Sequence, residues 1–219
     1  MATKGLLADL AAQLAGVVPQ PVAVESIGGV DAVRRVQEGV AFDAVVLAAD
    51  AIDSLIANGH ALVGSRVDLV TSVVAVAVRQ GSPQPVIDSE SALLQAVLAA
   101  RSIGYSTGPS GVQLMKLFDR WGIRAQVNAL LVQAPPGVPV GSLLAEGKVE
   151  LGFQQLGELM HLPGIAVLGP LPAAVQIVTT FSAAVTANST QPDAVRALLT
   201  LWASPAATPA KRRNGMDPA

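Results

Sequence analysis

The stretch Ser102–Gly111, S-I-G-Y-S-T-G-P-S-G, is the most informative part of this chain of 219 residues. Its apolar beginning predicts a short strand, and its second half predicts a turn that leads into a helix from Val112. A strand that enters a helix through small and hydroxylated residues leaves the first backbone N–H groups of the helix free to bind an anion. An ordinary helix cap on a β–α turn is the alternative interpretation. The expected helix carries a buried stripe at i, i+3, i+4 and i+7 spacing, formed by Leu114, Leu117, Phe118 and Trp121.

Strand and helix patterns alternate on both sides of this stretch. The alternation predicts an α/β fold with mainly parallel sheets and helices on both faces. The expected strands are 21–26, 44–48, 67–78, 149–153, 165–168 and 174–187, with an extended segment at 127–132. The expected helices include 30–38, one that Asp50 caps and Gly59 ends, 89–100, a short one that reaches Glu146, and one that begins at Pro192.

Two of the expected strands are long, and each lies beside a Pro/Gly break. The break 81–85 follows the strand 67–78, and the break 169–172 precedes the strand 174–187. This pattern predicts a chain that crosses twice between two lobes through a two-strand hinge. Lobe I would comprise residues 1–80 and 174–219, and lobe II would comprise residues 81–173.

The composition excludes several classes of protein. Net charge is −2 and only 14% of residues are charged, so no basic surface for nucleic acid is expected. The basic cluster Lys211–Arg213 is interpreted as a solvated helix end. The chain has no cysteine and only two histidines, His60 and His161, which argues against a metal site, and no cofactor is expected. No apolar run reaches the roughly 18 residues that a membrane span needs.

Several motifs, taken together in order, resemble the type II periplasmic solute-binding proteins, specifically the molybdate-binding-protein-like family of ABC importers. This family also includes aconitate isomerase. The resemblance covers nearly the whole chain and rests on Ser26–Gly29, Glu38–Ala48, the long strand that ends in Gly81-Ser82-Pro83, Val149–Gln155 and the C-terminal part from Leu198 to Ala219. It implies two α/β lobes that close on a small anion.

The resemblance also implies where the ligand contacts lie. They would come from the turn Ser26–Gly29, from Thr107–Gly111, from Val138-Pro139 and from Gln155. The predicted ligand residues are accordingly Ser26, Gly28, Gly29, Thr107, Ser110, Gly111, Val138 and Gln155, together with Ser72, Arg66 and Lys4. Ser72 has the alternative role of satisfying a buried strand end. Arg66 and Lys4 are the cations that an organic carboxylate would recruit.

Two departures from the family pattern affect the predicted ligand. Molybdate binders of this family commonly carry a tyrosine at the position of Gln155. Their first strand would align with positions before or at Met1-Ala2 of this sequence. The sequence therefore favours an organic carboxylate over molybdate, and the family's first strand is expected to be missing. The predicted function is a solute-binding protein for an ABC importer.

An aconitate-isomerase-like enzyme that acts on a polycarboxylate in the same cleft is the alternative. Its chemistry needs a base for proton transfer at carbon, and no motif places either histidine in that role. A ligand-sensing domain from a regulator is a third candidate, which no helix-turn-helix or basic stripe supports. The expected partners are a small anion and importer membrane subunits, with no nucleic acid, and the chain is expected to be a monomer. The resemblance implies a periplasmic location. The given N-terminus carries no signal peptide, so a cytoplasmic location is expected if this N-terminus is native.

Overall fold

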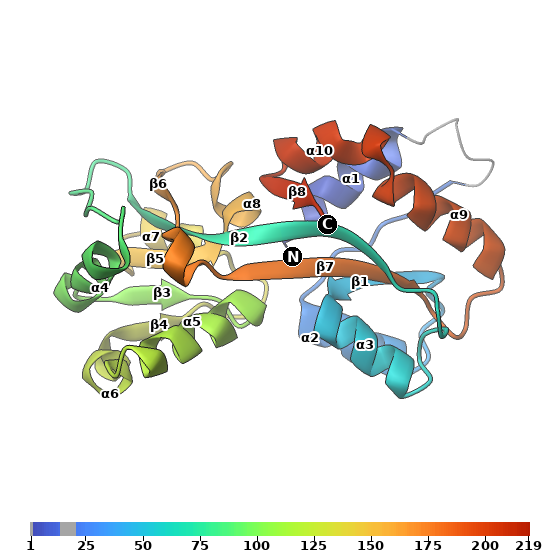
Figure 1. Cartoon of the computed structure of the whole chain (residues 1–219), viewed down its shortest axis with the longest axis horizontal. Helices are drawn as coiled ribbons and strands as arrows, with labels where there is room; N and C mark the ends of the chain where they lie inside the picture. Colours follow the sequence, from blue (N-terminus) through green and yellow to red (C-terminus); the bar gives the residue numbers. More distant parts are fainter. Residues whose placement is uncertain (1, 14–20) are drawn as a thin grey trace. The chain divides into compact units, whose positions relative to one another are not determined.

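The computed structural model describes residues 2–13 and 21–219, which form two compact units (Figure 1). Unit 1 comprises residues 1–72 and 179–219, and unit 2 comprises residues 73–178. One division lies inside the long strand β2, Val67–Arg79, between Ser72 and Val73. The other lies at the beginning of β7, Val178–Val185. Each unit is therefore built from its own part of β2.

Unit 1 has a sheet in which β7 lies between β1, Ala44–Ala48, and β2. The short C-terminal strand β8, Met216–Pro218, pairs antiparallel with residues 70–72 of β2. In Figure 1, one side of these strands is covered by α1, Lys4–Gln13, α9, Pro192–Ala203, and α10, Thr208–Arg213. The other side is covered by α2, Gly29–Gln37, and α3, Ala49–Ala57. A single turn of 3-10 helix, Pro205–Ala207, joins α9 to α10.

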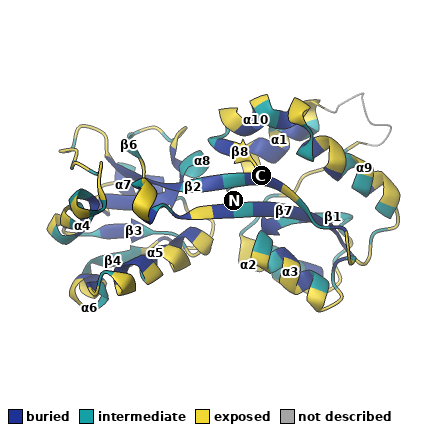
Figure 2. Cartoon of the chain, viewed as in Figure 1, coloured by how far each residue is buried: buried dark blue, intermediate teal, exposed yellow. Residues whose placement is uncertain are grey.

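Each face of the unit 1 sheet buries its own apolar cluster, and the central strands are buried in Figure 2. One cluster joins Leu6 and Leu10 of α1 to Leu199 and Trp202 of α9 and to residues of β2, β7 and β8. The second joins α2, α3 and β1, with Ile52 and Leu55 fully buried. Both helices of this second layer end where predicted, because Gly39 and Gly59 adopt the positive φ that a left-handed helix end requires.

Unit 2 is a five-stranded sheet in the order β6-β2-β5-β3-β4. The strands are β3, Ile103–Tyr105, β4, Leu131–Gln133, β5, Leu151–Gln155, and β6, Ile165–Pro170. The helices are α4, Glu90–Ala99, α5, Pro109–Arg120, α6, Arg124–Val127, α7, Val140–Ala145, and α8, Leu156–Leu159. Single turns of 3-10 helix lie at Asn128–Leu130 and Ala173–Val175.

The alternation of side chains along β2 divides the core of unit 2 into two layers. Val74, Val76 and Val78 belong to the larger cluster with α4 and α5, whereas Ala75 and Ala77 belong to the cluster with α7 and α8. Small residues on the second face let α7 approach the sheet. A Cβ on Gly152 of β5 would lie 2.7 Å from Leu144 of α7, so the glycine is what permits this packing.

The α/β class is confirmed, but the expectation of mainly parallel sheets is wrong for the described strands. Among the strand pairs of known register in the described residues, β3 is parallel to β4 and β5. β2 is antiparallel to β5, β6 and β8, and β1 is antiparallel to β7. The physical reason is connectivity. Helical crossovers deliver β4 and β5 to the sheet as parallel strands, whereas β2 enters unit 2 directly as the continuation of a strand of unit 1.

Several local expectations also need correction. Residues 21–26 form no strand, because this largely exposed segment has no strand partner among the described residues. Residues 124–130 are helical before β4 begins. The helix α5 begins at Pro109 rather than Val112, with proline at its favourable first position. The cap of α3 is Ala48 instead of Asp50, and β7 begins at Val178 after a 3-10 turn.

Candidate functional site

The parallel strands of unit 2 bring three predicted ligand segments to one edge of its sheet. Tyr105 of β3 is in register with Gln133 of β4 and with Phe153 of β5, so the carboxyl ends of all three strands lie side by side. The segments that leave this edge are the turn 106–111, the loop 134–139 and the β5–α8 junction at Gln155. In open α/β sheets, the carboxyl edge is where ligands bind. We refer to these three segments as the unit 2 edge.

The β3–α5 turn is held in one conformation by close packing. A Cβ on Gly111 would lie 1.9 Å from the carbonyl oxygen of Ser106, so no side chain fits at this position. The hydroxyl of Ser106 lies 2.9 Å from that of Ser110, whose side chain is buried. These two contacts fold the turn tightly over the beginning of α5.

This turn offers fewer free amides than the sequence suggested. Pro109 has no N–H, and the N–H groups of Gly111 and Val112 both donate to the carbonyl of Gly108. Within the described part of the chain, Ser110 is the residue of this first turn whose N–H has no acceptor. The donors at this point are therefore the Ser110 N–H and the linked hydroxyls of Ser106 and Ser110, with exposed Thr107 beside them.

The loop before α7 donates less than the resemblance implied. The N–H of Val138 bonds to the carbonyl of Pro135 at 3.0 Å, which closes a turn and removes this donor. The N–H of Val140, the first residue of α7, donates to the side-chain oxygen of buried Gln154 at 2.8 Å. Val138 remains partly exposed and offers an apolar surface.

The β5–α8 junction contains a carboxyl group that the sequence analysis missed. Gln155 is buried at the end of β5, opposite Val74, and Glu158 follows within α8. The amide of Gln154 hydrogen-bonds to the Glu158 carboxyl group, and burial raises the pKa of that carboxyl above its ordinary value. No spacing or motif in the sequence distinguishes Glu158 from a surface residue of a short helix.

In unit 1, the turn Ser26–Gly29 leads into α2, with Gly28 as the N-cap residue. Helix geometry leaves the N–H groups of the first turn of α2 without intrahelical partners. The carboxylate of Asp31 also lies in this turn, where it pairs with Arg34 at 3.3 Å. Val30 is 76% exposed beside these amides, so the turn presents both N–H donors and an apolar side chain.

The predicted cation Arg66 is already engaged. Its guanidinium lies 2.6 Å from a carboxylate oxygen of Asp53 and 2.8 Å from one of Asp68, and these partners raise its pKa further. Arg66 is therefore not available as an unpaired charge for a ligand. Lys4 is exposed at the first residue of α1, and Ser72 is 1% exposed at the end of the unit 1 part of β2.

A second residue missed by the sequence analysis is Lys211. We expected a solvated helix end, but this lysine is 1% exposed, whereas its neighbours Arg212 and Arg213 are exposed. A sequence signal did exist, because Ala207, Ala210 and Lys211 share the i, i+3, i+4 spacing of a buried helix face. The expectation of a solvated helix end gave more weight to the charge of Lys211 than to this spacing.

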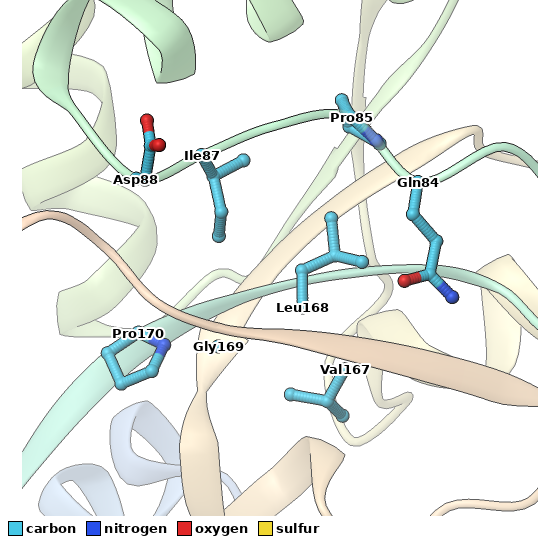
Figure 3. A pocket seen from close by; sticks show the side chains of 8 residues that line it. All are labelled: Gln84, Pro85, Ile87, Asp88, Val167, Leu168, Gly169 and Pro170. Atoms are coloured by element: carbon cyan, nitrogen blue, oxygen red, sulfur yellow. The ribbon is translucent and has the colours of Figure 1, made fainter.

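A shallow hollow of about 430 Å³ lies elsewhere on unit 2, between the loop 84–88 and β6 (Figure 3). Its walls include Ile87, Val167 and Leu168, with Asp88 at its margin. None of the predicted ligand residues lines it. Among residues 2–13 and 21–219, no group of His, Asp and Glu is arranged to hold a metal ion, and no helix is long and apolar enough to cross a membrane.

Residues 1–217 match the model of the bacterial extracellular solute-binding proteins. The chain belongs to this family. It is 41% identical to an aconitate isomerase from Pseudomonas sp. over 177 residues, which are 80% of this chain and 67% of that protein. The family assignment and the resemblance that the sequence indicated are thereby confirmed.

Solved structures show that the fold is the type II periplasmic-binding-protein fold. The periplasmic molybdate-binding protein of Azotobacter vinelandii superposes with a TM-score of 0.80 and 20% identity, covering 98% of this chain and 95% of that one. The tungstate-binding protein TupA from Desulfovibrio alaskensis G20 has a TM-score of 0.64 and 17% identity, covering 94% and 88%. The chain is a member of a solute-binding family with an enzyme among its relatives, and its family is extracellular.

Proposed function

We propose that this solute-binding protein captures a small organic anion, using donors of the unit 2 edge, and delivers it to the membrane subunits of an ABC importer. The observation that carries the proposal is the donor set around Ser110. A free N–H and two linked hydroxyls lie at a carboxyl sheet edge that contains no lysine or arginine. Neutral donors of this kind can bind oxyanions and carboxylates where little water is present.

Exposed apolar side chains favour an organic ligand over a tetrahedral oxyanion. Val112 is 53% exposed in the first turns of α5, and Val138 is 37% exposed before α7. An ion such as molybdate gains nothing from apolar contacts, whereas the carbon skeleton of an organic acid does. We therefore expect a di- or tricarboxylate.

A thermal-shift screen tests the ligand class. Molybdate, tungstate, sulfate and a set of di- and tricarboxylates are each added to the wild-type protein. A ligand present at 100 times its Kd should add about 2.7 kcal/mol to the free energy of unfolding. Stabilisation by carboxylates supports the proposal, and stabilisation by molybdate alone would overturn the organic class.

Substitution of Ser110 tests the site. Ser110→Asp places a negative charge at the proposed anion position, and calorimetry should show affinity reduced by at least about a hundredfold. Ser110→Ala is the milder variant, which keeps the N–H and removes one hydroxyl, and it should cost roughly tenfold. Ser91→Asp is the matched control, because Ser91 occupies the same second position in α4 of the same unit and is exposed. If both Ser110 variants bind the ligand as tightly as the Ser91→Asp control does, the ligand does not bind at Ser110.

Interconversion of cis- and trans-aconitate is the second candidate function, which the 41% identical relative favours. Proton transfer at carbon needs a group that accepts a proton and returns it, so that no atom is gained or lost overall. The unit 2 edge contains a suitable group in Glu158, whose pKa is raised by burial. Acid–base catalysts operate best when their pKa lies near the working pH.

An absorbance assay of aconitate isomers tests this second function. Wild-type turnover that is abolished in Glu158→Gln, with aconitate affinity retained, would support an enzyme in which Glu158 transfers the proton. Glu146→Gln, at the exposed end of α7, is the control and should retain full activity. Absence of wild-type turnover, together with measurable aconitate binding, would leave a binding protein.

A further inference from the structure

Gln154 and Glu158 interact at the β5–α8 junction of unit 2. The side-chain oxygen of Gln154 accepts the backbone N–H of Val140 at 2.8 Å. Because a backbone N–H can only donate, this contact fixes the orientation of the amide and leaves its NH2 group to donate to the Glu158 carboxyl. Glu158 is therefore held beside the beginning of α7, where the loop 134–139 ends. All of these residues belong to unit 2.

The Glu158 carboxyl can bind a second partner. The NH2 group of Gln154 occupies an acceptor oxygen, whereas a protonated carboxyl also has an O–H group that donates. Glu158 is only partly buried, so part of the residue remains accessible. The three segments of the unit 2 edge contain no lysine or arginine, and their donors are neutral. Glu158 therefore adds to these donors a group whose own charge depends on pH.

The charged groups around α8 leave burial as the main influence on Glu158. The helix packs mainly against β5, α7 and β6, and the sequences of these three elements contain no titratable residue. Glu146 follows α7 and pairs with Lys148 at 2.6 Å, and His161 lies in the loop after α8. The charge of the amino terminus lowers the pKa of Glu158, but burial raises this pKa by more. Burial favours the neutral, protonated carboxyl.

We propose that Glu158, held in place by Gln154, binds the organic ligand by donating a hydrogen bond from its protonated carboxyl group to a ligand carboxylate. The inference rests on the proposed function. A hydrogen bond from an O–H group to a carboxylate is charge-assisted, short and strong. Ionisation of Glu158 removes this donor and places a negative charge beside the bound anion. The affinity should therefore fall as the pH rises and Glu158 loses its proton.

Titration calorimetry with trans-aconitate at pH 5, 7 and 9 tests the inference. Glu158→Gln keeps a neutral tip that accepts from Gln154 and donates to the ligand, so its affinity should lie closest to that of the wild type at pH 5. At higher pH the variant should bind more tightly than the wild type, by up to about tenfold per pH unit above the folded-state pKa of Glu158. Comparing the two proteins cancels the ionisation of the ligand itself. Glu158→Leu removes the donor and should lower the affinity at pH 5 by at least about tenfold.

Glu146→Gln, at the exposed end of α7, is the matched control and should follow the wild type at each pH. Ligand-free melting temperatures show that each variant is folded. If wild-type protein binds neither trans-aconitate nor any other carboxylate, both the proposed function and this inference are overturned. If wild-type protein binds and Glu158→Leu retains its affinity, only the role of Glu158 is overturned. The donor role is also overturned if the affinity of the wild type rises with pH relative to that of Glu158→Gln.

Discussion

The backbone N–H of Val140 donates a hydrogen bond of 2.8 Å to the side-chain oxygen of Gln154, which joins the beginning of α7 to the end of β5. The same amide group binds the carboxyl group of Glu158 in α8. Gln154 thus connects two short helices at the unit 2 edge. Its role is structural, whereas its neighbour Gln155 remains a predicted ligand residue. Successive strand residues point to opposite faces, so the two glutamines differ in surroundings.

Gln154→Leu should therefore destabilise unit 2. The substitution leaves the buried Val140 N–H without an acceptor and removes the partner of Glu158, so we expect the free energy of unfolding to fall by about 1–3 kcal/mol. Denaturant unfolding measures the change. Gln84→Leu, in an exposed loop of the same unit, serves as the control and should have little effect. A Gln154 variant as stable as wild type would contradict this structural role.

Gly111→Ala should be among the most destabilising glycine substitutions. Its Cβ would meet the Ser106 carbonyl oxygen at 1.9 Å, a backbone contact that cannot relax without moving the turn. We expect a loss of roughly 2–4 kcal/mol, measured by thermal or denaturant unfolding. Gly28→Ala is the matched helix-start control, because its nearest contact would be an ordinary 3.6 Å to Asp31 and its φ is −60°. Similar losses at the two positions would argue against the close packing of the β3–α5 turn.

Much of the fold was predictable because local signals agree with tertiary packing. The strand 44–48 was predicted with its observed bounds, and Ser89 caps α4 through its hydroxyl, which accepts the N–H of Ala92. Strand direction was not predictable in the same way. It depends on which strands a crossover brings together, and the apolar pattern of β2 is the same for parallel and antiparallel neighbours.

The candidate site was predictable as a set of segments but not as a set of donors. The turn at Ser110 was located from its small residues, yet the carbonyl of Gly108 takes two of the N–H groups that we expected to be free. The charge state of a residue depends on partners that are distant in sequence. Asp53 engages Arg66, and the packing of α10 buries Lys211. The pairing of Asp53 with Arg66 leaves no signal in a single sequence, whereas the spacing of Ala207, Ala210 and Lys211 did indicate a buried helix face.

Asp68→Asn should lower the stability of unit 1 at neutral pH. Hydrogen bonds from Arg66 and then from Ser182 lower the pKa of the Asp68 carboxyl. A lowered pKa means that the stabilisation is present above the ordinary pKa near 3.8 and is lost as pH falls through the lower folded-state value. Because the pair is partly solvated, we expect only about 0.5–1 kcal/mol at pH 7.

Unfolding of wild type and Asp68→Asn between pH 2 and 7 measures this contribution. The gap in stability between the two proteins should narrow as the pH falls below 3.8 and should close once the pH is below the lowered folded-state pKa of Asp68. Asp119→Asn, on the exposed surface of α5, is the control and should follow the wild-type curve. A difference that is independent of pH would mean that Asp68 acts through packing instead of charge.

Glu158→Gln should have the opposite pH dependence. Burial raises the pKa of Glu158 above its ordinary value of 4.5. As pH rises above 4.5, the unfolded chain ionises first while the folded protein retains the proton, so the wild type loses stability until the folded pKa is reached. Glutamine is neutral at every pH and keeps a polar group for Gln154. The variant should therefore equal the wild type in stability near pH 4 and become more stable than the wild type at higher pH, with a slope of up to about 1.4 kcal/mol per pH unit.

Urea unfolding at pH 4, 6 and 8 measures the difference in stability between Glu158→Gln and the wild type, with Glu146→Gln as the exposed control. A variant less stable than wild type at pH 8 would mean that Glu158 is ionised and held by a positive partner, which would also remove its suitability as a proton-transferring group.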